Sequence, residues 1–231
     1  MELIHESHQV HFFSNNLDVE PNAQVITAIN EQLPEFKWVP VSGTELNPIT
    51  GEKRNFLTME CIIESVVRMR LEFTREDLVL NVDGCNIDDL QKIVRRIHTQ
   101  LSALFRLKQA NRLSVISSKL YQAPKEQYEA LYKKLFTYQG VNPFEWDNRI
   151  VERKQVRNSE QINSISSIRR LEIVAPTFNG GAPTDVICVD FDSNTIHQNN
   201  QRRFDLRSAD NTYQDLFDNN RQLAENVKRY F

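Results

Sequence analysis

The stretch of sequence that decides the fold runs from Phe56 to Leu107 and reads FLTMECIIESVVRMRLEFTREDLVLNVDGCNIDDLQKIVRRIHTQLSALFRL. As far as Phe73 it is a long β-type run rich in isoleucine, valine and leucine. A turn at 75–77 leads into Leu78-Val79-Leu80-Asn81-Val82-Asp83, which predicts the second strand of a hairpin. From Asp88 or Asp89 onward, apolar residues recur at spacings of three and four, as in an amphipathic helix. An antiparallel hairpin followed by a long helix indicates an α+β fold.

The elements on both sides of this stretch follow a similar order. Residues 8–14 and 36–39 predict strands, a helix opens at Pro21-Asn22 and runs to Gln32, and residues 42–53 predict a loop. Further on, strands are expected at 112–120, 149–156, 162–174 and 185–191, and helices at 124–136 and 212–230. A loop at 176–184 and an insertion at 192–208 separate the last of these elements.

Three local matches in the same order indicate an internal duplication. Phe36-Lys37-Trp38 corresponds to Phe144-Glu145-Trp146, Arg70-Leu71-Glu72 to Arg170-Leu171-Glu172, and Val82-Asp83 to Val189-Asp190. The offsets drift by a few residues, as loop insertions produce. The sequence therefore predicts two tandem α+β repeats, residues 1–110 and 111–231, each an antiparallel sheet with a long helix.

Composition and charge favour a globular protein and argue against a basic nucleic-acid module. The chain has 231 residues, of which 40% are hydrophobic and 26% charged, and its net charge is −3. Residues 1–110 carry 11 basic and 16 acidic side chains, and residues 111–231 carry 17 and 15. Nucleic-acid-binding modules are usually strongly basic, so a nucleic acid is the less expected partner.

Three features of the sequence bear on location. No apolar stretch reaches the ~18 residues that a membrane span needs, so no membrane association is expected. The residues after Met1 lack the basic and apolar regions of a secretory signal. Cys61, Cys85 and Cys188 are odd in number and far apart, which is typical of reduced thiols in a cytoplasmic protein.

The common catalytic motifs are missing, and the partial matches to them can be explained by ordinary structural roles. His5, His8 and His11 lie in an expected strand, where the middle side chain points away from the other two, so surface histidines are expected rather than a metal site. Asp190 and Asp192 end an apolar strand, where paired acids suit a turn.

A third approach to a catalytic motif is Asp147 followed by Glu152-Arg153-Lys154. Two carboxylates and a lysine form the metal site of many nucleases, but five residues are too few for the strand, turn and strand that such a site uses. No catalytic residue, no metal and no cofactor are therefore expected.

The aromatic segments of the two expected repeats are the candidate binding residues. A phenylalanine and a tryptophan two positions apart on a strand point to the same face, so each pair could line a groove for a partner. Trp146 precedes a basic stretch, and we expect it to be the more exposed tryptophan. The candidate site residues are Phe36, Trp38, Phe144, Trp146, Arg149 and Arg153.

Two resemblances connect these observations to known proteins. Over residues 8–230, the order of elements resembles that of a sporadically distributed, uncharacterised bacterial family of similar length. The resemblance includes Leu78-Val79-Leu80-Asn81 in the hairpin and Val189-Asp190-Phe191-Asp192 in the second half. One half, an antiparallel hairpin followed by a long helix, also resembles the SecB-like chaperone fold. That resemblance implies the binding of unfolded clients or, in some bacteria, of toxin–antitoxin components.

The expected function is therefore non-enzymatic protein binding. The chain would be a chaperone-like, adaptor or sensor subunit of a bacterial toxin–antitoxin or antiphage (antiviral defence) system, and its partner a client, a toxin or another subunit. The alternative is an RNA-binding protein or metal-independent endoribonuclease built from two ferredoxin-like repeats. In that alternative a histidine near the N-terminus would act as general acid or base, and arginines between Arg149 and Arg170 would hold phosphates.

Overall fold

The structure, a computed structural model, describes residues 1–46, 49–138, 140–157, 159–175 and 179–231. The described residues form a mixed α and β fold with ten strands and four α-helices. None of these helices is long and apolar enough to cross a membrane. Residues 47–48 and 176–178, which belong to two of the expected loops, lie outside the described part.

The bounds of the elements are as follows. The strands are β1 (Glu2–Ser14), β2 (Val39–Leu46), β3 (Lys53–Ile63), β4 (Val66–Phe73), β5 (Leu78–Asp83), β6 (Gln109–Gln122), β7 (Trp146–Gln155), β8 (Gln161–Ile173), β9 (Thr184–Thr195) and β10 (Phe204–Asp205). The α-helices are α1 (Ala23–Gln32), α2 (Ile87–Leu104), α3 (Lys125–Leu135) and α4 (Ala209–Val227). Short 3-10 turns are η1 (Pro34–Phe36), η2 (Asn179–Gly181) and η3 (Lys228–Tyr230).

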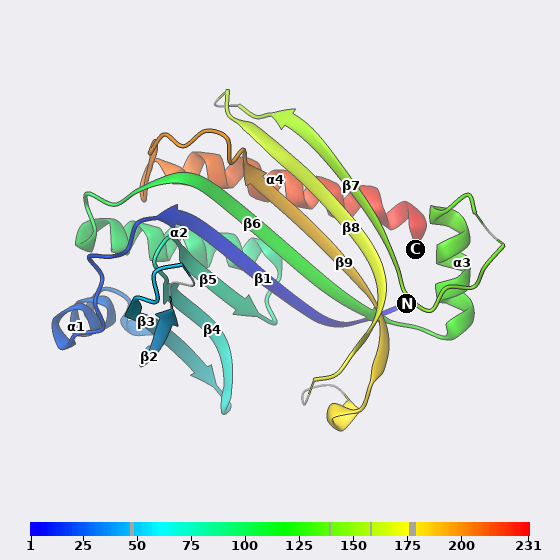
Figure 1. Ribbon diagram of the computed structural model, residues 1–231, viewed down its shortest axis with the longest axis horizontal. Helices are drawn as coiled ribbons and strands as arrows, with labels where there is room; N and C mark the ends of the chain where they lie inside the picture. Colours follow the sequence, from blue (N-terminus) through cyan, green and yellow to red (C-terminus); the bar gives the residue numbers. More distant parts are fainter. Residues whose placement is uncertain (47–48, 139, 158, 176–178) are drawn as a thin grey trace.

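All ten strands belong to one antiparallel sheet. Its order is β2-β3-β4-β5-β1-β6-β9-β8-β7, with the short β10 paired to β6. β1 and β6 pair at the centre, from Glu2 opposite Gln122 to Ser14 opposite Ala110. In Figure 1, α2 and α4 lie behind the sheet, α1 lies near one end of the molecule and α3 near the other. The two expected domains thus supply adjoining blocks of a continuous sheet, and the division between them stays a prediction.

The two sides of the sheet differ in chemistry. Residues paired across antiparallel strands share a side, and successive residues alternate between sides. The side facing α2 and α4 is apolar and buried, as in the cross-strand row Met59, Leu71, Leu80, Val10 and Val115. The next row, turned away from these helices, reads Glu60, Arg70, Asn81, Gln9, Ile116, Asp192 and Ile165.

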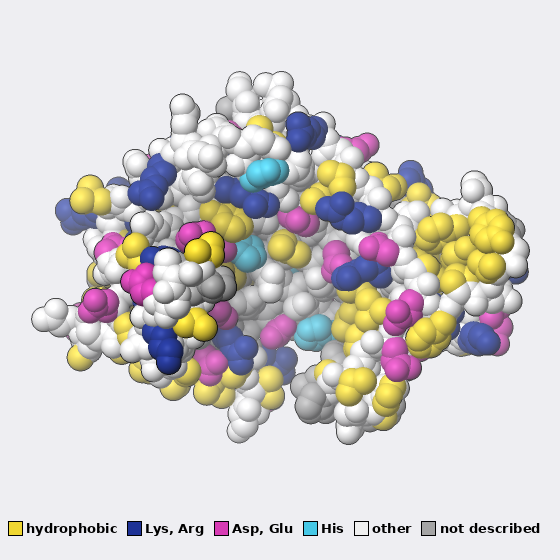
Figure 2. Space-filling view, viewed as in Figure 1, with side chains coloured by type: hydrophobic (Ala, Val, Ile, Leu, Met, Phe, Trp, Pro, Cys, Tyr) yellow, Lys and Arg dark blue, Asp and Glu magenta, His cyan; other side chains and the backbone are white. Residues whose placement is uncertain are grey.

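We call this second side the bare face, and it is the side turned toward the reader in Figures 1 and 2. Acidic, basic and histidine side chains are interspersed over it (Figure 2). A sheet needs only one apolar side to form a core, so the bare face is available for contacts with other molecules.

The main core lies between the sheet and the two long helices. It combines β1 residues such as Phe12 with Leu101 of α2 and with Tyr213, Leu216 and Phe217 of α4. A second, smaller cluster packs α3 against β9 and the end of α4. Because the main core takes side chains from both ends of the chain, the two halves bury their apolar surface together.

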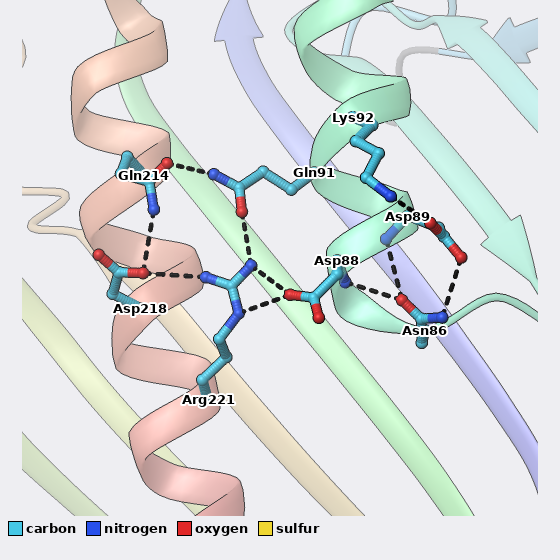
Figure 3. A network of polar contacts seen from close by, with 8 residues as sticks. All are labelled: Asn86, Asp88, Asp89, Gln91, Lys92, Gln214, Asp218 and Arg221. Atoms are coloured by element: carbon cyan, nitrogen blue, oxygen red, sulfur yellow. Dashed lines mark hydrogen bonds and ion pairs between the residues drawn. The ribbon is translucent and has the colours of Figure 1, made fainter.

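A polar network joins α2 to α4 (Figure 3). Arg221 of α4 forms ion pairs with Asp88 of α2 at 2.8 Å and with Asp218 of its own helix at 2.9 Å. Asn86 caps α2, because its side-chain oxygen accepts hydrogen bonds from the backbone N–H groups of Asp88 and Asp89. The two helices are therefore held together by ion pairs at their surface as well as by the core beneath them.

The expected helices are all present, whereas two predictions about strands are wrong. The run from Phe56 to Phe73 is two strands, β3 and β4, because Glu64 and Ser65 form a tight turn with φ values of 52° and 63°. Residues 36–39 do not form a strand, since Lys37 follows η1 with a φ of 48°. β2 begins at Val39 and occupies part of the expected loop at 42–53.

Candidate functional site

The aromatic groove expected from the sequence is not formed. Phe36 and Trp38 pack on each other beside β2, with ring centroids 5.1 Å apart, and Trp38 is only 4% exposed. Phe144 and Trp146 lie at the start of β7, the outermost strand at the opposite end of the sheet. Trp146 packs against the ring of Phe136, with centroids 5.6 Å apart, and is the more exposed tryptophan. The two pairs cannot line one groove, because the width of the sheet separates them.

The remaining two candidate residues, Arg149 and Arg153, are exposed on β7. They lie opposite Ser167 and Asn163 of β8, which places both on the bare face. They are well separated along the sheet from Phe36 and Trp38, because β7 and β2 are its two outer strands.

The three N-terminal histidines alternate between the two sides of β1, as expected. His8 is not a surface residue, however: it is 2% exposed, and its ring nitrogens make 2.9 Å hydrogen bonds to the Ser117 hydroxyl and the Cys85 carbonyl. Burial is the main reason that its pKa is lowered. His5 and His11 lie on the bare face, opposite Leu120 and Ser114.

The acidic residues singled out in the sequence do not form a metal site. Asp147 and Glu152 are an odd number of positions apart on β7, so their side chains point to opposite sides of the sheet. Asp190 lies within β9 and not in a turn. Its side chain accepts a 2.6 Å hydrogen bond from Ser118 and forms an ion pair with Arg169. Its carboxylate is thus already engaged on the bare face.

The charges on the bare face are balanced. Arginines and carboxylates occur on this side of the strands in similar numbers: Arg54, Arg68, Arg70, Arg112, Arg149, Arg153 and Arg169; Glu2, Glu45, Glu60, Glu72, Asp83, Asp147, Asp190 and Asp192. The strands of the bare face therefore carry no net positive charge over their width.

A pocket of about 380 Å³ opens where β1 ends and β6 begins, and here the balance of charge changes. It is lined by side chains from four separate segments, among them Phe13, Arg75, Glu76, Arg112, His197 and Arg202. We call it the arginine pocket. Three arginines and one glutamate line it, and one of the arginines, Arg75, is ion-paired with Glu52 at 3.3 Å, so the lining is still more basic than the whole chain, whose net charge is −3. An anion is therefore attracted to this place in preference to the rest of the bare face.

An aromatic ring forms part of the wall of the arginine pocket. The Phe13 ring stacks on the His11 ring, with centroids 5.4 Å apart and planes 11° from parallel. The guanidinium of Arg112 lies 4.8 Å from the centroid of the same Phe13 ring. Nε of Arg112 is buried and has no hydrogen-bond partner among the described residues. The pocket thus combines positive charge, an unsatisfied donor and an aromatic ring that already contacts His11 and Arg112.

Asp77 holds His11 in position behind this ring. Nδ1 of His11 lies 2.6 Å from Oδ2 of Asp77, and both side chains are largely buried. Burial raises the pKa of Asp77, and the hydrogen bond with His11 opposes this rise. The pair fixes the orientation of the His11 ring and hence of the stack that it forms with Phe13.

The sequence contained no signal for this site. Its residues come from β1, from the turn between β4 and β5, from β6 and from the loop after β9, so no local motif joins them. Asp77 and Arg75 were expected only as turn residues, and Arg112 only as the start of a strand. They meet because β5, β1, β6 and β9 are neighbours in the sheet, and that order could not be read from spacing along the chain.

No protein-family model and no curated protein matches the chain. Among solved structures, similarity is found to a rolling circle replication initiator protein from Geobacillus stearothermophilus. The sequence identity is 11% and the TM-score 0.31, over 94% of this chain and 79% of the other.

The function expected from the sequence is contradicted. A chaperone-like or adaptor protein was expected, with an RNA-binding protein or endoribonuclease as the alternative, and the similar structure is that of a replication initiator. The positions of the aromatic residues bear on the chaperone-like or adaptor function. Trp38, one of the residues expected to line a client groove, is buried beside β2, and the pair Phe144 and Trp146 lies far from it at the start of β7.

Proposed function

We propose that the protein binds single-stranded DNA, with backbone phosphate in the arginine pocket and a base stacked on Phe13. The observation that carries the proposal is that Arg112 and Arg202, with the ion-paired Arg75 beside them, line a pocket whose wall includes an aromatic ring. Arginine is suited to phosphate because its planar guanidinium presents several donors at once. Base stacking on an aromatic side chain is the other common element of single-strand binding.

The distribution of charge favours a single strand over a duplex. Binding along a duplex draws its affinity from cations that neutralise many phosphates over a wide surface. The strands of the bare face carry arginines and carboxylates in similar numbers, so they provide no such surface. The excess positive charge is confined to the arginine pocket, which suits a few phosphates at one place. A single strand also leaves its bases free to stack on Phe13, which paired bases in a duplex are not.

Fluorescence anisotropy with a 5′-labelled twelve-nucleotide DNA strand tests the proposal. Arg112→Ala should weaken binding at least about tenfold at low salt and reduce the slope of affinity against salt, because one phosphate contact is lost. Phe13→Leu should weaken binding about fivefold or more without changing that slope, since stacking carries no charge. Circular dichroism of each variant confirms that it is folded.

Arg149→Ala is the matched control for Arg112→Ala, because Arg149 is also an arginine on the bare face but lies on β7. It should bind the strand within about twofold of the parent. The proposal fails if the parent shows no salt-dependent binding, or if Arg149→Ala loses as much affinity as Arg112→Ala. Tighter binding of a duplex or of RNA of the same sequence would also contradict it.

We also propose that the chain arose by duplication into two repeats. The support is the parallel order of elements: β1 lies beside β5 and β6 beside β9, and each set is followed by a long helix, α2 or α4. The SecB-like description of each half, the relation to the bacterial family and the cytoplasmic location remain predictions of the sequence. A protein partner also remains a prediction.

A further inference from the structure

The two outer strands of the sheet differ in how well their free edges are protected. β2 contains Pro40, which has no backbone N–H to offer to another strand, and Gly43, which is covered by the Phe56 ring. β7 has ten residues without proline or glycine and pairs with β8 in unbroken register from Trp146 opposite Arg170 to Gln155 opposite Gln161. Among the described residues, no strand pairs with its other edge.

The middle of β7 is also exposed and partly apolar. All five residues from Arg149 to Arg153 are exposed, with Ile150 at 46% and Val151 at 47%. Figure 1 shows β7 as the outer strand on the side of the sheet away from β2. A long, straight and unpaired edge with exposed apolar residues is a template for pairing with another strand.

The sequence of β7 is complementary to itself when two copies run antiparallel. A two-fold axis perpendicular to the sheet keeps the bare faces of both copies on the same side. Each residue of β7 therefore lies opposite a residue of the other copy whose side chain points to the same face. With Ile150 on the axis, Asp147 of each copy lies opposite Arg153 of the other. In this register Arg149 lies opposite Val151, and its aliphatic stem can cover the valine.

The neighbouring registers are unfavourable. With Val151 on the axis, Arg149 of each copy lies opposite Arg153 of the other, so like charges meet twice. With Arg149 on the axis, the two copies of Arg149 lie opposite each other, and with Glu152 on the axis the two copies of Glu152 do. Like charges directly opposite each other destabilise a strand pair. Of the four registers centred on residues 149–152, the one centred on Ile150 is the one that pairs opposite charges.

We propose that two copies of the chain associate through β7, with Ile150 on the two-fold axis, to form one sheet that continues across both subunits. The proposal is independent of the proposed DNA binding. Charge pairs between Asp147 and Arg153 set the register, and the exposed Ile150 and Val151 are covered in the process. The bare faces of the two subunits then lie on one side of the joint sheet.

Sedimentation velocity of the full chain over a wide range of concentrations tests this association. The parent should form dimers at micromolar concentrations, and the dimers should weaken as salt is raised. Arg153→Glu and Asp147→Lys should each remain monomeric, because each places like charges together. An equimolar mixture of these two variants should form heterodimers, since both pairs between positions 147 and 153 in the heterodimer join opposite charges. Circular dichroism shows whether each variant is folded.

Arg149→Glu is the matched control, because Arg149 is a charged residue on the same strand and face but lies opposite Val151 in the proposed register. It should dimerise within about threefold of the parent. If Val151 were on the axis instead, Arg149→Glu would strengthen the dimer and refute the register. A parent that stays monomeric at high concentration, or an Arg153→Glu variant that dimerises like the parent, would overturn the proposal.

A cross-link gives a second measurement that does not depend on charge. Ile150→Cys places a thiol on the axis, where it meets its own copy, and mild oxidation should join the subunits by a disulfide. Val151→Cys is the control, since its thiol would lie opposite Arg149. The native Cys61 and Cys188 are buried and Cys85 is partly exposed, so the parent chain serves as the control for cross-linking through native thiols. Equal cross-linking of the two variants would contradict the register.

Discussion

At the scale of single residues, His98 is the clearest case of a side chain whose chemistry is changed by its place in the fold. It lies on the buried side of α2, with its ring centroid 6.0 Å from that of Phe12 and 5.0 Å from that of Tyr213. Nδ1 is buried without a hydrogen-bond partner among the described residues. Burial lowers the pKa of His98 from 6.5 to about 4, because the core cannot solvate the charged ring.

This shift makes stability depend on pH in a defined window. Between about pH 6.5 and pH 4 the unfolded chain binds a proton at His98 that the folded chain does not, so stability falls as the pH falls through this range. Lowering the pH from 7.5 to 5 should remove roughly 2 kcal/mol of the free energy of unfolding. Urea titrations at the two pH values measure this loss.

His98→Phe is the variant that isolates this contribution, since phenylalanine keeps a ring between Phe12 and Tyr213. Its loss of stability between the two pH values should be clearly smaller than that of the parent. The part that remains comes from groups such as His8, whose pKa is also lowered by burial. His197→Gln is the control, because His197 is exposed, and it should behave like the parent. An equal loss in His98→Phe and the parent would show that His98 does not stay neutral in the core.

At the scale of elements, the sequence predicted helices better than strands. Helix α1 begins after Asn22, as its cap and apolar spacing indicate, and α2 follows its apolar stripe closely. The β3–β4 turn was missed because Glu64 and Ser65 adopt left-handed conformations without the glycine or asparagine that usually marks such a turn. The part of β2 from Ser42 to Leu46 was missed because the chain at 42–53 is rich in polar and small residues, and its pairing with β3 comes from tertiary contacts.

The cap of α2 gives a test at this scale. Asn86→Ala removes the acceptor for the N–H groups of Asp88 and Asp89 and should cost about 1 kcal/mol of the free energy of unfolding. Asn86→Asp is the matched control, because a carboxylate oxygen can accept the same hydrogen bonds, and it should recover most of that loss. Urea denaturation followed by circular dichroism gives both values. The same loss in both variants would mean that the side-chain cap does not contribute.

At the scale of the whole molecule, the order of the strands is what the sequence could not supply. Hydrophobic alternation shows that a segment is a strand and which residues share a side, but not which strand is its neighbour. The central pairing of β1 with β6 brings together residues about 100 positions apart. The arginine pocket depends on this order, and so its residues could be identified only from the structure. The edge position of β7 likewise follows from the order and not from the sequence of β7.

The shared core predicts that the two halves unfold together. Tyr213, Leu216 and Phe217 of α4 pack in one cluster with residues of β1, β3 and α2, so the loss of either half exposes the core of the other. Trp38 and Trp146 lie at opposite ends of the sheet and serve as local probes. In the single-tryptophan variants Trp38→Phe and Trp146→Phe, urea unfolding followed by fluorescence should coincide with unfolding followed by circular dichroism.

Two separate transitions, one for each tryptophan, would contradict this prediction and would favour independent domains at 1–110 and 111–231. The expressed fragments provide a control. If the core is shared, the fragment 1–110 should show weak secondary structure and no cooperative transition, because it lacks α4. A fragment that unfolds cooperatively on its own would show that the first half does not need α4.

The position of β1 also has a consequence for synthesis of the chain on the ribosome. Both neighbours of β1 in the sheet, β5 and β6, come much later in the sequence. At ~5–20 residues per second, the ribosome needs roughly 3 to 13 seconds to pass from the end of β1 to the start of β5. During that time both edges of β1 are unpaired, and its apolar side chains Val10 and Phe12 are exposed to solvent once the strand has left the exit tunnel. The nascent chain is therefore most prone to aggregate before its middle has been translated.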